Sequence, residues 1–170
     1  RYDQSADTTS SADVKLIKEW VLNDTKPPFM EKLDLSTIDL DTDKPGSAIY
    51  KGIIDLIVLR GALDFKTGQP PQFDSDKIQD DHIFPKSVFS KNKYVDSVLN
   101  MTWMSDKTNM FIKKAKKPSE YITTFIKENF GGDENKFIEC LESHLIDKKV
   151  FEAMKSDDFD LFLTSRQEKI

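Results

Sequence analysis

The 170-residue sequence has a single cysteine, Cys140, and only two histidines, His82 and His144. One cysteine excludes an internal disulfide framework and a zinc ribbon built on CxxC pairs, and it favours a reducing, cytoplasmic setting. No stretch approaches the roughly 18 consecutive apolar residues of a transmembrane helix, so we expect no membrane partner. A bound metal would need oxygen or imidazole ligands, which indicates a magnesium-like ion rather than structural zinc.

The formal net charge is −5, because 30 Asp and Glu residues outnumber 25 Lys and Arg residues. The lysines nevertheless gather between His82 and Lys117, where eight of them outweigh two aspartates. Counterion release depends on local contacts rather than on total charge, so such a stripe can bind a polyanion. The alternative is that these lysines only solvate an exposed helix.

The domain organisation follows from composition. Residues 1–12 (RYDQSADTTSSA) are polar and predict a flexible segment, whereas residues 13–170 have the size and apolar content of a single helical domain. The sequence begins with Arg1, and we expect a C-terminal fragment of a longer protein. Periodicity and capping residues predict helices at 13–23, 47–63, 106–117, 119–130, 133–154 (with a break near Asp147) and 157–170.

Two short strands are predicted before the basic helix. The first spans roughly 78–84 and is closed by Pro85, and the second spans 97–105. Ser105 then caps the helix that follows. The fold class is therefore mainly α (α+β), with a two-stranded hairpin and a helix at about 78–117 embedded in a helical shell.

This strand–strand–helix segment carries residues suited to phosphodiester hydrolysis. Asp81 and His82 lie on the first strand, Asn100 on the second, and Asn109 on the helix. Such hydrolysis needs a base to activate water and a metal to neutralise the scissile phosphate. A neutral imidazole suits the first task, and carboxylate or amide oxygens suit the second. An isolated Asp-His pair is more often structural, so the two asparagines are what favour a site.

The residues "DHIFPKS", a later Asn and "DKTN" resemble the HNH, or ββα-metal, nuclease motif. More closely, "DFKTG", "VLNMTWMSDKTNMFIKKAKKPSEYI" and the ending "FDLFLTSRQEKI" resemble the C-terminal HNH domain of GmrSD-type modification-dependent restriction enzymes. The same domain type occurs in phosphorothioate-sensing phage-defence nucleases. The resemblance runs over most of residues 47–166.

The resemblance implies a role for each motif residue. His82 would be the general base, Asn100 would orient it, and Asp81 and Asn109 would hold a single Mg²⁺ or Mn²⁺. Lys113 stands where some HNH proteins have a further metal-binding histidine. A charged lysine cannot ligate a metal, so we expect two protein ligands, completed by phosphate and water.

The implied activity is that of a hydrolase: a metal-dependent HNH endonuclease that nicks or cleaves DNA in restriction-modification or antiviral defence. The expected partner is phage or modified DNA, and the alternative is a non-catalytic DNA-binding effector on the same scaffold. An RNA substrate also stays open. An N-terminal ParB-like sensor or NTP-binding module, which the family carries, is expected to be missing here. The expected DNA-binding residues are Lys86, Lys107, Lys113, Lys114, Lys116 and Lys117.

Three further residues have weaker predictions. His144 lies in a helical pattern without a partner motif, which predicts a surface or half-buried position. Arg166 matches a family position without a derivable role, although a structural ion pair is one interpretation. Asp80 either pairs with a lysine or supports Asp81.

Overall fold

A computed structural model describes residues 6–28, 40–42, 45–71, 77–114 and 117–170. The chain forms two compact units, residues 1–38 and residues 39–170. The sequence analysis expected one helical domain over residues 13–170, which includes part of the first unit and the whole of the second. Residues 24–46 are rich in Pro, Asp and Thr, a composition typical of a connection between units rather than of a shared core.

The first unit contains α1 (Ala6–Asn23). Residues 6–12 are therefore helical, whereas the sequence predicted a flexible segment up to residue 12. Asp, Ser and Thr are favoured at helix starts, so their presence did not exclude a helix.

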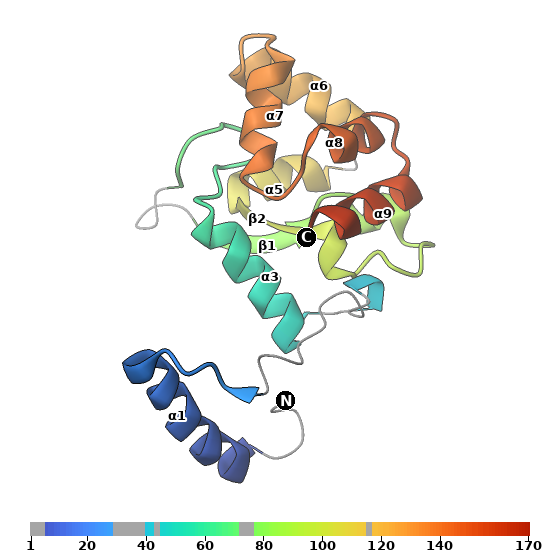
Figure 1. Cartoon of the computed structure of the whole chain (residues 1–170). Helices are drawn as coiled ribbons and strands as arrows, with labels where there is room; N and C mark the ends of the chain where they lie inside the picture. Colours follow the sequence, from blue (N-terminus) through green and yellow to red (C-terminus); the bar gives the residue numbers. More distant parts are fainter. Residues whose placement is uncertain (1–5, 29–39, 43–44, 72–76, 115–116) are drawn as a thin grey trace. The chain divides into compact units, whose positions relative to one another are not determined.

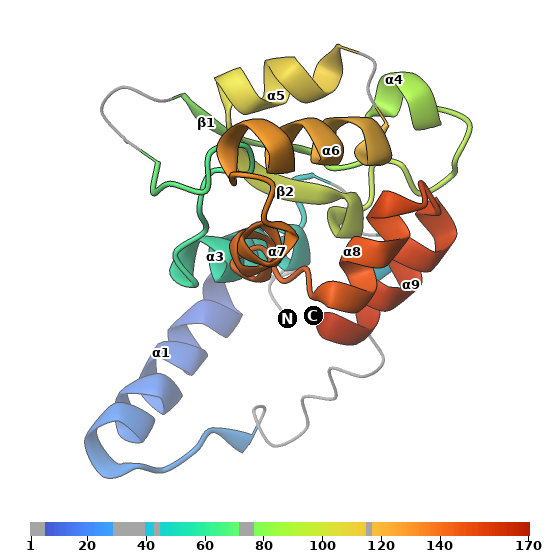
Figure 2. The ribbon, with the colours of Figure 1, turned by 90° about the horizontal axis from the view of Figure 1, so that it is seen from above.

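The second unit is mainly helical with one small sheet, as expected (Figure 1). In the two views the sheet lies between α3 and α5, and α6 to α9 complete the surrounding helices (Figures 1 and 2). Its elements in chain order are a 3₁₀ turn (Leu40–Thr42), α3 (Ala48–Leu59), β1 (Ile78–His82), α4 (Lys86–Phe89), a 3₁₀ turn (Val98–Asn100), β2 (Met101–Ser105), α5 (Asp106–Lys113), α6 (Pro118–Asn129), α7 (Glu134–Glu142), α8 (Lys148–Lys155) and α9 (Phe159–Lys169).

Capping residues set several helix starts where the sequence placed them. The Ser47 side chain accepts a hydrogen bond from the Tyr50 N–H, and the Ser105 side chain accepts one from the Thr108 N–H. Asp147 caps α8 through the Val150 N–H, which confirms the predicted break near that residue. The helix predicted over 47–63 ends at Leu59 instead, because the chain leaves the helix through a glycine at φ 74°.

The strands β1 and β2 are antiparallel, and their register pairs Ile78 with Ser105 and His82 with Met101. Both strands are shorter than predicted. Residues Val98–Asn100 form a 3₁₀ turn because the Ser97 side chain accepts a hydrogen bond from the Leu99 N–H. The pairing nonetheless continues for one residue beyond β1, since the Ile83 N–H donates to the Asn100 carbonyl (2.8 Å).

Aromatic side chains form the core next to the sheet. Phe84, two residues after β1, has its ring centroid 4.7–5.1 Å from those of Phe89, Phe159 and Phe162. The predicted inward residues of the last helix, Phe159, Phe162 and Leu163, are all buried. These contacts anchor α4 and α9 to the end of β1. Among the described helices, none has both the length and the apolar character that crossing a bilayer requires.

Candidate active site

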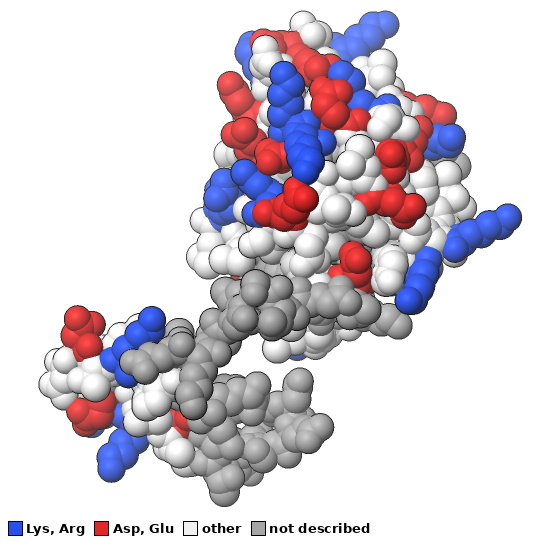
Figure 3. Space-filling view, turned by 45° about the vertical axis from the view of Figure 1, so that its right-hand side comes forward, with Lys and Arg blue, Asp and Glu red and all other residues white. Residues whose placement is uncertain are grey.

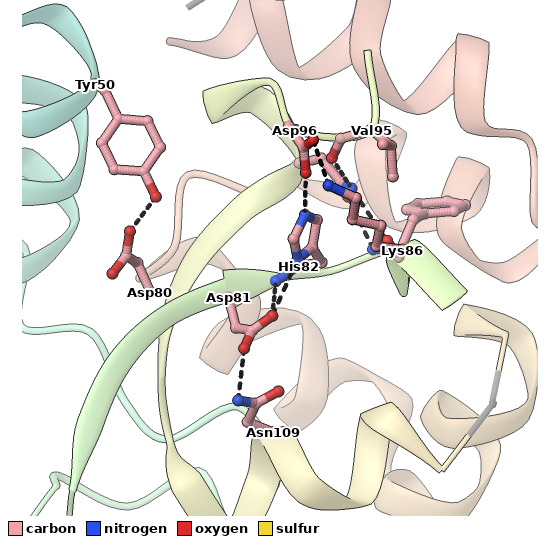
Figure 4. Close-up of polar contacts among 10 residues, drawn as sticks. Tyr50, Asp80, Asp81, His82, Lys86, Val95, Asp96 and Asn109 are labelled. Atoms are coloured by element: carbon pink, nitrogen blue, oxygen red, sulfur yellow. Dashed lines mark hydrogen bonds and ion pairs between the residues drawn. The ribbon is translucent and has the colours of Figure 1, made fainter. Parts of the chain in front are cut away.

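The end of β1 brings Asp81 and His82 into direct contact. Asp81 Oδ1 accepts the main-chain N–H of His82 (2.8 Å) and lies 3.1 Å from His82 Nδ1 (Figure 4). Neighbouring strand residues ordinarily point to opposite faces. Here the short Asp81 side chain turns back onto the next N–H, as Asp commonly does. The carboxylate and the imidazole can therefore act at one place.

The helix α5 adds Asn109 to this pair. Asn109 Nδ2 donates to Asp81 Oδ2 (2.6 Å), and both side chains are buried (Figure 4). The oxygen and nitrogen of an amide can exchange places by a rotation of 180°. Asn109 can thus present an oxygen beside Asp81, as the prediction of a second metal-side residue requires.

Asp64 holds the start of α5 in place. Its carboxylate accepts hydrogen bonds from the Thr108 hydroxyl (2.9 and 3.0 Å) and from the Ser105 N–H (3.2 Å). Burial alone would raise the pKa of Asp64, but these hydrogen bonds outweigh it and hold the pKa below its usual value. Sequence reasoning quoted Asp64 within "DFKTG" without assigning it this role.

Asn100 is fully buried and binds main chain. Its side chain accepts from the Phe84 N–H (2.8 Å) and donates to the carbonyls of Phe84 (3.1 Å) and Val95 (2.9 Å). The resemblance implied that Asn100 orients His82, and none of these hydrogen bonds joins the Asn100 side chain to the His82 ring. Asn100 instead clamps the two ends of the loop between Phe84 and Val95.

Asp96 is the residue that sequence reasoning missed. Its Oδ1 lies 3.0 Å from His82 Nε2, and its Oδ2 accepts from Lys86 Nζ (2.6 Å) (Figure 4). Burial lowers the pKa of His82, but the hydrogen bonds to Asp81 and Asp96 outweigh it, so the pKa lies above its usual value. No motif spacing indicated Asp96, because it comes from a loop.

Arg166 supports the backbone beside Asn100. It is fully buried, and its guanidinium donates to the carbonyls of Leu99 (2.5 Å), Met101 (3.0 Å) and His144 (3.1 Å). Burial lowers its pKa to about 9. Among the described residues, Arg166 thus binds main-chain carbonyls, whereas the sequence suggested an ion pair.

His144 is fully buried, which corrects the prediction of a surface or half-buried residue. It follows α7, and its ring lies between the Leu63 carbonyl (Nε2, 2.6 Å) and the Thr102 hydroxyl (Nδ1, 2.7 Å). A carbonyl only accepts, so Nε2 carries the hydrogen and Nδ1 accepts from Thr102. These partners lie far away in sequence, which is why the local helical pattern could not reveal them.

Asp80 has a partner different from both expectations. It accepts a hydrogen bond from the Tyr50 hydroxyl of α3 (Figure 4). Burial and this contact raise the pKa of Tyr50. Asp80 therefore ties β1 to α3, apart from the Asp81–His82 pair.

The six predicted DNA-binding lysines have different surroundings. Lys107, Lys114 and Lys117 are exposed, and Lys86 is exposed but paired with Asp96. The side chain of Lys113, and Lys116 as a whole, lie outside the described residues. On the face that Figure 3 shows, basic and acidic side chains are interspersed.

A small hollow adjoins the pair at the end of β1. Its volume is about 260 Å³, and it is lined by Asp81, His82, Pro85, Lys86, Ser87 and Ile112. Within the described ranges, no group of three or more His, Cys, Asp or Glu side chains is arranged to hold a metal. A cation here would depend on the oxygens of Asp81 and Asn109 together with water or substrate. Such a donor set fits Mg²⁺, which keeps several waters in proteins.

Comparison with known proteins shows a similarity over most of the chain. The chain is 34% identical over 177 aligned residues to an uncharacterized protein of Methanocaldococcus jannaschii. The alignment covers 95% of this chain but only 30% of the length of that relative. No family model matches the chain, and no solved structure matches it.

Proposed function

We propose that this chain is a metal-dependent HNH-type endonuclease domain that nicks or cleaves DNA as the effector part of a restriction or phage-defence protein. One observation carries the proposal: Asp81 contacts both His82 and Asn109, so three residues from β1 and α5 converge at one point. The convergence joins a base, a carboxylate and an amide, which are the groups that phosphodiester hydrolysis requires.

The proposed metal site consists of Asp81 and Asn109. A divalent cation held there would neutralise charge on the scissile phosphate and on the departing 3′-oxygen. Asp81 is buried and lies at the wall of the hollow, so its carboxylate is both shielded from bulk water and open to a phosphate group. The position of Asn109 is fixed by α5, which Ser105 and Asp64 hold at its start.

His82 removes the proton from the attacking water in this proposal. Its side chain is 18% exposed and lines the hollow, so water reaches it although most of the ring is packed. The adjoining carboxylates keep the ring from rotating and stabilise the imidazolium that forms. Lys86, Lys107 at the start of α5, and Lys114 and Lys117 after that helix would contact phosphates along the nucleic-acid strand.

A plasmid-cleavage assay with Mg²⁺ or Mn²⁺ tests the proposal. We expect the full chain to convert supercoiled DNA to nicked or linear product, and EDTA to abolish the reaction. Asp81→Asn should abolish cleavage, while Asp55→Asn, the same change at an exposed position of α3, should leave it unchanged. Cleavage by Asp81→Asn at the parent rate would contradict the proposed site.

Binding measured separately decides between the endonuclease and a non-catalytic DNA-binding effector. The endonuclease predicts that Asp81→Asn retains DNA affinity while cleavage is lost. Salt-dependent binding by the parent without cleavage in either metal would favour the non-catalytic effector. The same assay with single-stranded and duplex RNA tests whether RNA is the substrate.

A further inference from the structure

The two oxygens of the Asp96 carboxylate contact different partners. One oxygen faces His82 Nε2 (3.0 Å), and the other accepts from Lys86 Nζ (2.6 Å). Lys86 begins α4, only four residues after His82, while Asp96 comes from the far end of the loop. The ion pair thus holds the loop carboxylate against one nitrogen of the imidazole.

The main chain also directs Asp96 toward His82. Asn100 binds the carbonyl of Val95, the residue before Asp96, and both main-chain groups of Phe84, two residues after His82. Arg166 holds the backbone on either side of Asn100 through the carbonyls of Leu99 and Met101. Asn100 therefore affects the imidazole through the loop that carries Asp96.

The hydrogen-bonding capacities of these groups determine where a neutral His82 carries its hydrogen. An ionised carboxylate only accepts, so Asp96 beside Nε2 and Asp81 beside Nδ1 compete for the one ring hydrogen of a neutral imidazole. On the other side of the ring, Asp81 Oδ1 already accepts the main-chain N–H of His82, and Asp81 Oδ2 accepts from Asn109. Asp96 Oδ1 has the imidazole as its partner, which favours the hydrogen on Nε2.

We propose that Asp96, held by Lys86 and by the Asn100 clamp, is a positioning residue that fixes His82 as the Nε2–H tautomer. The second half of the inference rests on the proposed endonuclease function: Nδ1 is then the nitrogen that takes the proton from water. Nδ1 lies 3.1 Å from Asp81 Oδ1, so the proton acceptor faces the same carboxylate that the metal site uses. Base and metal ligand thereby act on one water.

Nuclear magnetic resonance of the two imidazoles tests the tautomer directly. The full chain, labelled with ¹⁵N and loaded with Mg²⁺, contains only two histidines, so long-range ¹H–¹⁵N spectra give two ring patterns. At the alkaline end of a pH titration, where the ring is neutral, His82 should show its hydrogen on Nε2. His144, whose Nε2 donates to the Leu63 carbonyl, provides an internal reference for that pattern and for correct folding.

Two substitutions of Asp96 separate its hydrogen bond from its charge. In Asp96→Ala, the His82 hydrogen should move to Nδ1, since Asp81 is then the carboxylate left within reach of the ring in the described part of the chain. In Asp96→Asn, the amide oxygen still accepts, so the hydrogen should stay on Nε2. Asp55→Ala is the matched control and should leave both ring patterns unchanged.

The cleavage rate should depend on which ring nitrogen of His82 carries the hydrogen. We expect Asp96→Ala to lower the cleavage rate about 10- to 100-fold, as loss of an orienting partner typically does, and Asp96→Asn to recover most of it. A parent His82 with its hydrogen on Nδ1, or an Asp96→Ala variant that keeps the Nε2–H pattern, would overturn the inference. If the tautomers behave as expected but the parent cuts no nucleic acid, the endonuclease proposal fails while the role of Asp96 in fixing the ring stands.

Discussion

His82 lies on β1 and His144 contacts Thr102 of β2, but the two histidines have opposite surroundings. His82 ends β1, borders a hollow, and has a carboxylate near each ring nitrogen. His144 is fully buried between the Leu63 carbonyl and the Thr102 hydroxyl, and Thr102 is the cross-strand partner of Asp81. One histidine thus faces carboxylates and water, while the other is packed in the interior between a carbonyl and a hydroxyl.

The difference shows that the partners of an imidazole decide its chemistry. Carboxylates favour the imidazolium, so the pKa of His82 lies above its usual value. Burial favours the neutral ring, so the pKa of His144 falls to about 4. In the neutral ring, Nε2–H donates to the Leu63 carbonyl and Nδ1 accepts from the Thr102 hydroxyl, so both partners are satisfied without burying another charge. These surroundings suit His82 to the proposed role of a base and His144 to a role in fold stability.

The largest expected effect is a loss of DNA cleavage when the His82 side chain is removed. His82→Ala should lower DNA cleavage about 10³-fold, within the range that a general base contributes. The free energy of unfolding should change by less than about 1 kcal/mol, because His82 is partly exposed and its partners reach solvent or other donors. Plasmid cleavage and urea unfolding give the two values. Parent-like cleavage by the variant would remove His82 from the mechanism.

The pH dependence of stability distinguishes the two histidines further, because their contributions to the free energy of unfolding change with pH in opposite directions. The unfolded state protonates its histidines near pH 6.5, whereas folded His144 does so only near pH 4. The unfolded state therefore binds more protons between these values, and His144 should reduce the free energy of unfolding by up to about 3 kcal/mol as pH falls from 6.5 to 4. His82 stabilises below pH 6.5, and its contribution is lost as pH rises through its higher folded pKa.

Urea unfolding at several pH values separates the two contributions. His144→Phe should flatten the acid side of the stability profile, and His82→Ala should flatten the alkaline side. An acid slope that is the same in His144→Phe and in the parent would contradict the neutral, buried assignment of His144.

A smaller effect comes from removing the buried hydrogen bonds at neutral pH. His144→Phe keeps a ring next to Phe65, whose centroid is 5.1 Å from that of His144, but it leaves the Leu63 carbonyl and the Thr102 hydroxyl without this partner. We expect a loss of about 2 kcal/mol in the free energy of unfolding. Adding Thr102→Val should recover part of that loss, whereas additive losses would show that the two groups are not coupled.

The smallest effect concerns the exposed lysines near the His82 site. Lys107→Ala, Lys114→Ala and Lys117→Ala should each weaken DNA binding and reduce the slope of log affinity against log salt by at most about 0.9. Lys148→Ala, at the exposed start of α8, is the matched control and should leave the slope unchanged. If none of the three substitutions changed the affinity or the salt slope, the basic segment would only solvate the surface.

Much of the fold could be predicted because its signals are local. Ser47, Ser105 and Asp147 cap helices through hydrogen bonds to residues three positions ahead, and such spacing is visible in sequence. Asp81, His82 and Asn109 could be grouped because two short strands and the next helix bring nearby segments together. The strand ends were less predictable, because the Ser97 side chain accepts a hydrogen bond from the Leu99 N–H and this local bond competes with strand pairing.

The parts that were missed depend on contacts between distant segments. Asp96 lies in a loop whose direction is set by Asn100, so the spacing from His82 did not indicate contact. Leu63 is 81 residues from His144 in the chain, and the periodicity of a single helix contains no information on such a partner.

By itself, the sequence determined the helical class of the second unit, its helix caps, and the set of Asp, His and Asn side chains available for chemistry. Capping hydrogen bonds join residues only a few positions apart, and apolar periodicity also depends on nearby residues. Both can therefore be recognised in the sequence. Only the tertiary structure decided that Asp96 reaches His82, that Asn100 binds main chain, and that His144 is sealed from water. These outcomes depend on burial and on long-range hydrogen bonds, which exist only once the strands, the loop and α9 have packed together.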